Sequence, residues 1–325
     1  MKLRIGIAGY GNVGRGAAMA VAANADMELV AIFTRRDPKS LKIDNNAAVL
    51  PIDSAEAMVG KIDVLLLCGG SATDLPEQGP QLAAMFNTVD SYDNHAKIPE
   101  YMASIDSVAK NTTAIVSAGW DPGLFSMMRA QYEAVVPTGS TYTFWGKGVS
   151  QGHSDAIRRV KGVKNAVQYT IPVDDAICAV RSGVMPTLKP REKISRDCYV
   201  VLEPDANKDD VEKVIKTMPN YFADYNTTVT FIDEDELIAK HSNMPHGGMV
   251  IRSGQSGESG QNNHVLEFSL KLDSNPEFTG SIMAVYARAA YRMSREGLYG
   301  AKTVFDVPFS YISVKDRFTL IKELL

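Results

Sequence analysis

The sequence contains few cysteines and no long apolar run, and each absence excludes a class of protein. Its three cysteines, Cys68, Cys178 and Cys198, form no CxxC pair, so neither a disulfide framework nor a zinc site is expected. No apolar run approaches the roughly 18–20 residues that a membrane-spanning helix needs. The opening residues, MKLRIGIAG, lack the apolar core and the cleavage site of a signal peptide. These features favour a cytoplasmic protein without a membrane partner.

The charge of the chain is nearly balanced. Lys and Arg number 34 against 38 Asp and Glu, which gives a formal net charge of −4. A protein that binds nucleic acid normally presents a clustered basic face, so no nucleic-acid partner is expected. With 325 residues, 45% of them apolar and 22% charged, the chain has the size and composition of a globular protein of two domains.

Residues 1–120 alternate segments typical of strands and of helices. Nearly continuous apolar runs, typical of parallel strands buried on both faces, mark the strands. The alternation predicts a doubly wound parallel sheet, the Rossmann type of α/β fold. The predicted strands are residues 3–8, 28–33, 64–68, 88–92 and 114–118, and the predicted helices are residues 12–23 and 99–110.

From residue 121 the pattern changes to longer strands with partial alternation, interrupted by short helices. Alternation predicts a sheet with one covered face and one wetter face, so residues 121–275 are expected to form an α+β domain that binds the substrate. The predicted strands are residues 141–145, 166–173, 198–203, 228–232, 249–252 and 265–272, and the predicted helices are residues 209–217 and 233–241.

Three further segments follow from local sequence. Asp121-Pro122 suits the start of a helix, since Asp caps well and Pro is tolerated at the first helical position. Residues 253–263 are rich in Gly, Ser, Asn and Gln, which predicts a mobile loop. A long helix is predicted at residues 278–296, and Gly297 ends it. Residues 276–325 are expected to pack back on the first domain.

A GxGxxG motif stands at the turn between the first predicted strand and the first predicted helix. The first glycine permits a tight turn, the second lets the backbone approach a pyrophosphate, and the third lets helix and strand pack closely. The order strand, turn, helix favours a dinucleotide site over a glycine turn without a ligand. The motif consists of Gly9, Tyr10, Gly11, Asn12, Val13 and Gly14.

The second predicted strand ends in Thr34, Arg35 and Arg36, with no carboxylate before Asp37. An NAD site usually carries Asp or Glu at this position for the ribose 2′-hydroxyl. Guanidinium groups instead form charge-assisted bonds with a phosphate, so the sequence favours NADP over NAD. The alternative is that both arginines are solvated charges at the end of a strand.

Small residues follow the third predicted strand, where a Rossmann sheet binds its ligand. They would let the ribose and nicotinamide lie close to the backbone. Cys68 could be a nucleophile, but a Cys at the end of a buried strand is more often an inert part of the core. The cofactor-binding candidates in this segment are Cys68, Ser71, Ala72 and Thr73.

Two acidic residues follow the last two predicted strands of the first domain. Asp93 and Asp121 are expected at the same edge of the sheet as the nicotinamide. Paired carboxylates there suit a substrate ammonium, which they would hold by charge-assisted bonds, and one could accept a proton as an amine is oxidised. The alternative for Asp121 is a plain helix N-cap.

The second domain offers a few polar candidates. Arg196 precedes a predicted strand and could bind a carboxylate, although an isolated Arg is usually a surface residue. His246 lies in the turn-like sequence MPHGG, where a His is more often structural than catalytic. Thr170 and the cluster Gln151-Gly152-His153-Ser154-Asp155 complete the set. The scattered histidines show no spacing of a zinc site, so no metal is expected.

Ten segments together resemble the meso-diaminopimelate dehydrogenase family over almost the whole chain. The resemblance implies a homodimeric NADP enzyme with a Rossmann domain and a substrate and dimerisation domain. It implies reversible oxidative deamination of the D-centre of meso-2,6-diaminopimelate to L-2-amino-6-oxopimelate and ammonia, with cyclisation of the product to L-tetrahydrodipicolinate in lysine biosynthesis. The segments are GYGNVG, FTRR, LCGGSATDLPEQ, VDSYDNH, SAGWDPGLFS, TFWGKGVSQGHSDA, VQYTIP, TMPNYF, MPHGG and LDSNPEF.

The resemblance also implies roles for individual residues. It places Asp93 and Asp121 around the reacting amino group. Around the D-centre it adds Trp120, Trp145, Gln151 and Gly152. Around the distal L-centre it sets Thr170, Arg196, His246 and Asn275. Gly69 departs from the pattern, because some members carry a larger residue there. The positions that would have to change to admit simple D-amino acids keep the residues of the family, namely Gln151, Asp155, Thr170, Arg196 and His246.

Two other interpretations compete with this one. Another NADP dehydrogenase of similar architecture, of the homoserine dehydrogenase or dihydrodipicolinate reductase type, would not need the WDPG and SQGHSDA segments. A non-catalytic NADP-binding sensor would have no reason to carry two Asp at strand ends and an Arg in the second domain.

Overall fold

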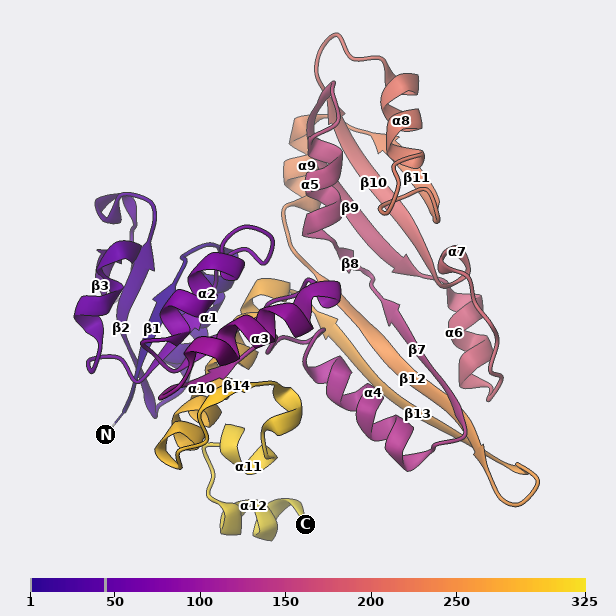
Figure 1. Ribbon diagram of the computed structural model, residues 1–325. Coiled ribbons are helices and arrows are strands. Elements are labelled where there is room, and N and C mark those ends of the chain that lie inside the picture. The colour runs from indigo at the N-terminus through magenta and orange to yellow at the C-terminus, as the bar shows by residue number, and fades with distance from the viewer. Residues whose placement is uncertain (1, 44–45) are drawn as a thin grey trace. The chain divides into compact units, whose positions relative to one another are not determined.

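The computed structural model describes residues 2–43 and 46–325, and the chain folds as two compact units. The first unit comprises Met1–Met127 and Pro276–Leu325, and the second comprises Met128–Asn275. Both ends of the chain therefore belong to the first unit, whose strands and helices are labelled in Figure 1.

The first unit is built on a seven-stranded sheet with the order β14-β6-β5-β4-β1-β2-β3. All neighbouring strands are parallel. From the edge at β3, the order β3-β2-β1-β4-β5-β6 is the doubly wound order of a dinucleotide-binding domain. The predicted Rossmann fold is confirmed. The strands are β1 (Leu3–Ala8), β2 (Met27–Thr34), β3 (Ala48–Pro51), β4 (Val64–Leu67), β5 (Thr88–Asp90), β6 (Thr113–Ile115) and β14 (Gly300–Lys302).

Helices and short 3-10 turns accompany this sheet. Strand β4 is buried along its whole length, as its uninterrupted apolar sequence VLLL predicts. None of the helices formed by residues 2–43 and 46–325 has both the length and the apolar character to cross a bilayer. The helices are α1 (Asn12–Ala23), α2 (Leu75–Ala83), α3 (Ile98–Val108), α10 (Asn275–Arg295), α11 (Phe309–Ile312) and α12 (Arg317–Leu324), and the 3-10 turns are Pro38–Ser40, Ile52–Met58, His95–Lys97 and Val304–Asp306. Helix α4 (Leu124–Val135) starts in the first unit, and its residues from Met128 onward belong to the second.

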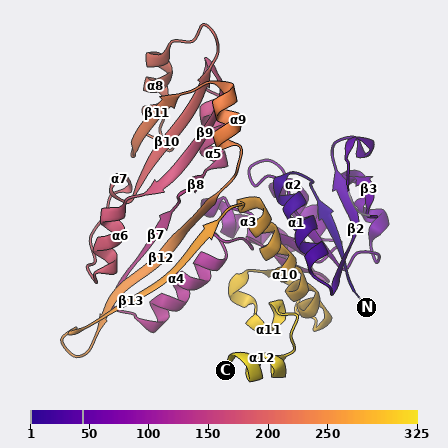
Figure 2. The same cartoon turned by 180° about the vertical axis from the view of Figure 1, so that it is seen from behind.

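Helices α1 and α10 approach each other at two glycines (Figure 2). A Cβ atom on Gly16 would lie 2.6 Å from the carbonyl oxygen of Pro276, and one on Gly280 would lie 2.3 Å from the backbone nitrogen of Ala17. Backbone atoms cannot rotate away as a side chain can, so this contact requires glycine on both helices. The C-terminal segment also adds β14 beside β6, so it completes the first unit.

The second unit contains two smaller sheets. One has four strands in the order β11-β10-β9-β8, and the other has three antiparallel strands in the order β13-β12-β7. Its strands are β7 (Gly139–Trp145), β8 (Gly148–Val149), β9 (Val163–Pro172), β10 (Ile194–Leu202), β11 (Asn226–Phe231), β12 (His246–Ser256) and β13 (Asn262–Leu272). Its helices are α5 (Gln151–Arg158), α6 (Asp174–Arg181), α7 (Pro190–Lys193), α8 (Lys208–Lys216) and α9 (Glu234–His241).

Helices cover both faces of the four-stranded sheet. On one face, Ile157 of α5 and Ile215 of α8 pack with Cys198 of β10. On the other face, Leu237 of α9 packs with Val167 of β9. The α+β class predicted for the second domain is observed, because most neighbouring strands are antiparallel and the helices lie on the sheet faces rather than between parallel strands.

The predicted start of a helix at Asp121-Pro122 is wrong. Helix α4 begins at Leu124, after Gly123 with φ +132°. The backbone N–H of Leu124 donates to the carbonyl of Gly119 at 3.1 Å, and that of Phe125 donates to the carbonyl of Trp120 at 2.8 Å. A tight loop therefore precedes the helix, and Asp121 lies inside that loop.

The mobile loop predicted at residues 253–263 is also wrong. Strand β12 continues to Ser256 and β13 starts at Asn262, so most of the segment is a hairpin. Polar side chains pair across it: Gln255 donates to Asn263 at 3.0 Å, and the Ser256 hydroxyl lies 2.7 Å from the His264 ring. Composition suggested a loop because it does not show cross-strand pairs between polar residues.

Several elements differ from their sequence-based prediction for a visible reason. Helix α2 contains Pro76, Gly79 and Pro80, and α5 contains a glycine and five polar residues, so neither carried a helical apolar period. Strands β5 and β6 were predicted to reach residues 92 and 118 but end at Asp90 and Ile115. Beyond those points the backbone N–H groups of Tyr92 and Ser117 donate to the Asp90 carboxylate.

We expect Gly280→Ala to lower the free energy of unfolding by about 1–3 kcal/mol, the usual cost of overpacking. An alanine gains roughly 1 kcal/mol of helix propensity, so a net loss means that the clash with Ala17 and Gly16 exceeds this gain. Ser281→Ala, at the next and exposed position of α10, is the matched control and should change stability by less than about 0.5 kcal/mol. Urea unfolding measures both. A Gly280→Ala protein as stable as the control would contradict the close contact.

Candidate functional site

The turn between β1 and α1 forms a backbone cradle. Gly9 has φ +93°, a conformation that favours glycine, and a Cβ atom on Gly14 would lie 2.1 Å from the carbonyl oxygen of Gly9. A Cβ atom on Gly11 would meet nothing within 4 Å, and Gly11 precedes α1 without a capping side chain. The N–H groups of the first helical turn are therefore open to an anion, so this cradle fits the pyrophosphate of a dinucleotide.

Two neighbouring cavities continue from this cradle, with volumes of about 360 and 710 Å³. Their linings share Thr34, Arg35 and Arg36 with Ile52 and Gln78, so the two cavities meet at the end of β2. An elongated ligand with a phosphate at this position fits the pair. The smaller cavity is lined by Gly9, Tyr10, Gly11, Phe33, Thr34, Arg35, Arg36, Ile52, Cys68, Gly69, Gly70, Asp74 and Gln78.

Hydrogen bonds hold the two arginines at this position. The Arg36 guanidinium donates to the carbonyl of Tyr10 at 2.8 Å, and the Arg36 backbone N–H donates to the Thr34 hydroxyl at 3.0 Å. Arg35 forms an ion pair with Asp74 at 2.7 Å although 65% of its side chain is exposed. Asp74 also accepts the backbone N–H of Gly70 at 3.0 Å, so it links Arg35 to the glycine turn after β4.

The segment after β4 lies along the same cavity. Cys68 and Gly69 line it, and Ser71, Ala72 and Thr73 form the turn that leads to α2. Burial of the Cys68 thiol raises its pKa to about 12, so the thiol stays protonated at neutral pH. A protonated thiol is a poor nucleophile, which agrees with Cys68 as an inert wall residue.

The predicted acidic residues follow two neighbouring parallel strands of the first unit. Asp93 is exposed three residues after β5, and its backbone N–H donates to the Ser71 hydroxyl at 3.2 Å. Asp121 is half-buried in the loop between β6 and α4. Trp120 beside it is 8% exposed and packs edge-on against Phe125, with ring centroids 5.3 Å apart. Because β5 and β6 are adjacent and parallel, both loops start at the same edge of the sheet as the glycine cradle.

A buried cation occupies the four-stranded sheet of the second unit. Arg196 was predicted to precede a strand, but it is the third residue of β10 and only 6% exposed. Its guanidinium donates to the Thr170 hydroxyl at 2.5 Å and lies 4.3 Å from the centre of the Tyr225 ring. Over residues 2–43 and 46–325, Arg196 forms no ion pair, and its Nε atom has no hydrogen-bond partner. A buried guanidinium without a carboxylate favours binding of an anionic ligand.

Two imidazoles near Arg196 are neutral. Burial and, to a smaller extent, the charge of Arg196 lower the pKa of His153 to about 4. Burial and Arg196 also lower the pKa of His246, which begins β12 rather than lying in the predicted turn. Nδ1 of His246 lies 2.8 Å from the backbone nitrogen of Gly247 and 3.1 Å from its carbonyl oxygen, so the neighbouring backbone holds this edge of the ring. The histidines therefore add polarity beside Arg196 without adding charge.

The other predicted residues of the second unit lie around Met244. The Gln151 amide, at the start of α5, lies 3.0 Å from the Met244 sulfur. The backbone N–H of Asn275 donates to the carbonyl of Met244 at 3.0 Å. Gly152 follows Gln151 and is exposed, and a Cβ atom there would meet nothing within 4 Å. Trp145 ends β7 and pairs with Gly248 in the strand that His246 begins.

Sequence reasoning missed two residues beside Arg196. Gln168 is fully buried, and in the described part of the chain neither atom of its amide has a hydrogen-bond partner. A signal existed, because Gln168 stands between the apolar residues Val167 and Tyr169 in a predicted strand. Tyr225, whose ring lies against Arg196, gave no such signal because it follows α8 in an irregular segment.

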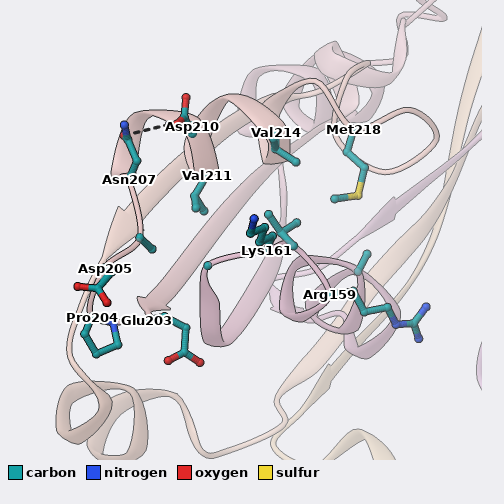
Figure 3. Close-up of a pocket in the computed structure, with 14 residues that line it drawn as sticks. Arg159, Lys161, Glu203, Pro204, Asp205, Asn207, Asp210, Val211, Val214 and Met218 are labelled. Atoms are coloured by element: carbon teal, nitrogen blue, oxygen red, sulfur yellow. Dashed lines mark hydrogen bonds between the residues drawn. The ribbon is translucent and has the colours of Figure 1, made fainter.

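A third cavity, of about 980 Å³, lies elsewhere in the second unit and contains none of the predicted site residues (Figure 3). The end of α5, the loop after β10 and helix α8 surround it. Apolar side chains such as Val211, Val214 and Met218 form part of its lining, and charged residues such as Lys161 and Glu203 form another part. Its size exceeds that of the other two, but it lacks both a glycine cradle and a buried unpaired charge.

Across residues 2–43 and 46–325, no three His, Cys, Asp or Glu side chains gather as ligands for one ion.

The fold and these sites define a class of protein. A doubly wound parallel sheet with a glycine cradle after β1 and two arginines after β2 is the architecture of an NADP-dependent oxidoreductase. Residues 119–274 match the family described as "Diaminopimelic acid dehydrogenase C-terminal domain". The meso-diaminopimelate D-dehydrogenase of Ureibacillus thermosphaericus is 60% identical over 326 residues, which cover 100% of this chain and 99% of the relative. The chain belongs to the meso-diaminopimelate D-dehydrogenase family.

Solved structures support the same family over the whole chain. A six-position variant of the meso-diaminopimelate dehydrogenase of Clostridium tetani, solved with DAP, is 53% identical with a TM-score of 0.94, and the match covers 100% of both chains. An engineered D-amino acid dehydrogenase bound to NADP+ is 41% identical with a TM-score of 0.88, again over 100% of both chains. The resemblance seen in the sequence is confirmed, and the cofactor is NADP.

Proposed function

We propose that the chain catalyses the reversible NADP-dependent oxidative deamination of the D-centre of meso-2,6-diaminopimelate. The products are L-2-amino-6-oxopimelate, which cyclises to L-tetrahydrodipicolinate in lysine biosynthesis, and ammonia. The observation that carries this proposal is the buried Arg196 without an acidic partner among the described residues, in a member of this family. A substrate with a second carboxylate would neutralise that charge, whereas the substrate of a simple amino acid dehydrogenase would not.

The first unit is proposed to bind the cofactor. The motif from Gly9 to Gly14 would receive the pyrophosphate at the start of α1, and Thr34, Arg35 and Arg36 would bind the 2′-phosphate. The segment from Cys68 to Thr73 would lie beside the ribose and nicotinamide. Bound NADP supplies an acceptor for the hydride of the D-carbon.

The acidic residues of the same unit are proposed to act on the reacting amino group. Asp93 and Asp121 would hold the substrate ammonium by charge-assisted bonds, and one of them would accept a proton as the amine is oxidised. Trp120, whose indole is buried, is proposed to lie at the D-centre, and water would hydrolyse the imine that hydride transfer leaves there, which releases ammonia. Trp145, Gln151 and Gly152 are proposed to contact the D-centre as well.

The buried cationic group of the second unit is proposed to recognise the distal L-centre. Arg196 would bind its carboxylate, with the Thr170 hydroxyl fixing the guanidinium. The pKa of His246 is lowered by burial, so its imidazole is neutral, and it would donate a hydrogen bond from Nε2 to the same carboxylate. Asn275 would complete the set. Binding energy at this remote end positions the reacting carbon, because a group that takes no part in the chemistry can still orient the substrate.

The enzyme is proposed to be a homodimer that works in the cytoplasm. The resemblance implies the homodimer, with residues 121–275 as the domain that carries both substrate binding and dimerisation. The cytoplasmic location rests on the use of NADP and on a product that enters amino-acid biosynthesis.

The direct test is an assay with NADP and meso-diaminopimelate that follows the absorbance of NADPH. Turnover of the meso compound, with little turnover of the L,L isomer, is the expected result because only the meso compound offers a D-centre beside an L-centre. A non-catalytic sensor would give no signal. An enzyme of the homoserine dehydrogenase type would instead oxidise homoserine.

Arg35→Gln combined with Arg36→Gln should weaken NADP binding much more than NAD binding. Each lost phosphate contact should cost about 1.5–3 kcal/mol, the range for hydrogen bonds to charged groups. Titration calorimetry with NADP and NAD measures the two affinities. Arg159→Gln combined with Lys161→Gln is the control, because this pair also removes two positive charges, beside the cavity of Figure 3, and should leave both affinities unchanged. An unchanged preference in the double variant would remove the arginines from the cofactor site.

Asp93→Asn and Asp121→Asn should each lower kcat by about 100-fold or more, since positioned acid–base groups contribute at least that factor. NADP affinity should stay the same, because neither residue lines the cofactor cavity. Asp106→Asn is the control: this carboxylate of α3 accepts the backbone N–H of Ala301 and is remote from the strand ends in sequence. Near-wild-type rates for both variants would reduce the two residues to surface or loop roles.

Arg196→Met should lower kcat/KM for meso-diaminopimelate by roughly 10- to 100-fold, from the loss of a charge-assisted pair. Small D-amino acids such as D-alanine have no second carboxylate and should be affected far less. The variant should fold, because removing Arg196 strands no buried carboxylate and relieves the desolvation that lowers its pKa. Kinetics on both substrates give the answer. Equal losses on the two would mean that Arg196 supports the fold or the cofactor instead.

A further inference from the structure

Asp90, the last residue of β5, is a buried carboxylate that the proposed reaction does not use. It is 1% exposed and accepts hydrogen bonds from three directions. One carboxylate oxygen accepts the backbone N–H of Tyr92 at 3.0 Å and that of Ser117 at 2.9 Å. The other accepts the hydroxyl of Tyr101, on α3, at 2.9 Å. The backbone carbonyl of Asp90 accepts the N–H of Ala118 at 2.7 Å.

These bonds replace strand pairing at the place where the sheet ends. The pairing of β5 with β6 stops at Val89 and Ile115, and the segments beyond it carry Asp93 on one side and Asp121 on the other. Ser117 has φ +58°, a left-handed conformation that a non-glycine residue rarely adopts. The bond from its N–H to Asp90 helps to hold that conformation, which turns the chain toward Trp120 and Asp121.

We propose that Asp90 is a positioning residue, which sets the geometry of the two segments that carry Asp93 and Asp121. The inference rests on the proposed roles of those two carboxylates. An ionised carboxylate makes stronger hydrogen bonds with backbone N–H groups than a neutral side chain does, so its charge tightens both segments at once. A small displacement of a reacting group can cost a large factor in rate, so this residue acts on turnover without touching substrate.

The charge of Asp90 also gives this device a pH dependence. Burial raises the pKa of Asp90 to about 6, against the hydrogen bonds from Ser117, Tyr92 and Tyr101, which lower it. The titratable side chains that face it are two phenols: Tyr101 from α3, and Tyr92, whose ring stacks on Tyr101 at 4.2 Å. Burial raises the pKa of both phenols, so they stay neutral while Asp90 titrates. Because the pKa of Asp90 is higher in the folded protein than its ordinary value, the free energy of unfolding decreases as the pH rises from that ordinary value through about 6. An Asn side chain does not ionise, so the Asp90→Asn variant avoids this loss of stability and should fold.

The first experiment compares Asp90→Asn with the control Asp106→Asn. The control also removes a carboxylate that accepts a backbone N–H, but that N–H belongs to Ala301 and not to the segments that carry Asp93 and Asp121. With NADP and meso-diaminopimelate, Asp90→Asn should lower kcat about 10-fold while KM changes by less than about 3-fold, because the distal carboxylate site is intact. The control should keep the wild-type kcat. If the wild-type enzyme turns over meso-diaminopimelate and Asp90→Asn has the same kcat, this inference is wrong and the proposed function stands.

The second experiment uses Tyr101→Phe, which keeps both backbone bonds to Asp90 and removes only the hydroxyl. That hydroxyl lowers the pKa of Asp90, so its loss should move the acid limb of the kcat profile, expected near pH 6, to higher pH. Asp90→Asn should lack this limb. A profile that Tyr101→Phe leaves unmoved shows that Asp90 does not control the reacting groups.

The third experiment needs no turnover. The chain has two tryptophans, Trp120 and Trp145, so Trp145→Phe leaves Trp120 as the reporter of the segment after Ser117. In that background Trp120 emission should titrate with a midpoint near pH 6, and adding Asp90→Asn should abolish the titration. Emission that titrates identically with and without Asp90 refutes the link between Asp90 and this segment, whatever the enzyme acts on.

Discussion

The packing of the first unit depends on helix α1, which the backbone of two other segments approaches closely. Gly14 lets the helix pack against the turn that ends β1, and Gly16 lets it pack against α10. Any side chain at either position would push the start of α1 away from the strand ends. These two contacts set the position of the N–H groups that fit a pyrophosphate, of the cavity beside them and of the C-terminal segment.

The sequence predicted the first unit well because the signals there are local. Apolar runs such as VLLL identify buried parallel strands without knowledge of their neighbours, and the helix at residues 12–23 was predicted with the bounds that the structure gives. The errors come where hydrogen bonds outside the strand and helix patterns hold the backbone. The Asp90 carboxylate accepts the N–H groups of Tyr92 and Ser117, where β5 and β6 were predicted to continue, and the loop whose carbonyls bond to the start of α4 places that start two residues after the predicted one. The bond from Ser117 to Asp90 joins residues 27 positions apart in sequence, so a window along the chain cannot reveal it.

The candidate site shows the same division between local and tertiary information. The glycine motif and the arginines after β2 could be predicted because residue type and spacing alone define them. The character of Arg196 could not, because nothing in its neighbours along the chain indicates that it lies buried in a strand beside Thr170 and Tyr225. Burial is a property of the folded sheet. Gln168 lies between these two cases, because the sequence shows a polar residue within a predicted strand but only the structure shows that it is buried beside Arg196.

The ion pair between Arg35 and Asp74 has a consequence for the thermodynamics of cofactor binding. A long exposed side chain usually loses rotamer freedom when it grips a phosphate, and this entropy opposes association. Asp74 already fixes the guanidinium of Arg35 against the turn after β4, so that ordering has occurred during folding. In the proposed cofactor site the phosphate would meet a preorganised donor, which it would share with a carboxylate of the same sign. Both the enthalpy of binding and the entropic penalty would then be smaller, an exchange suited to a cofactor that must leave after every turnover.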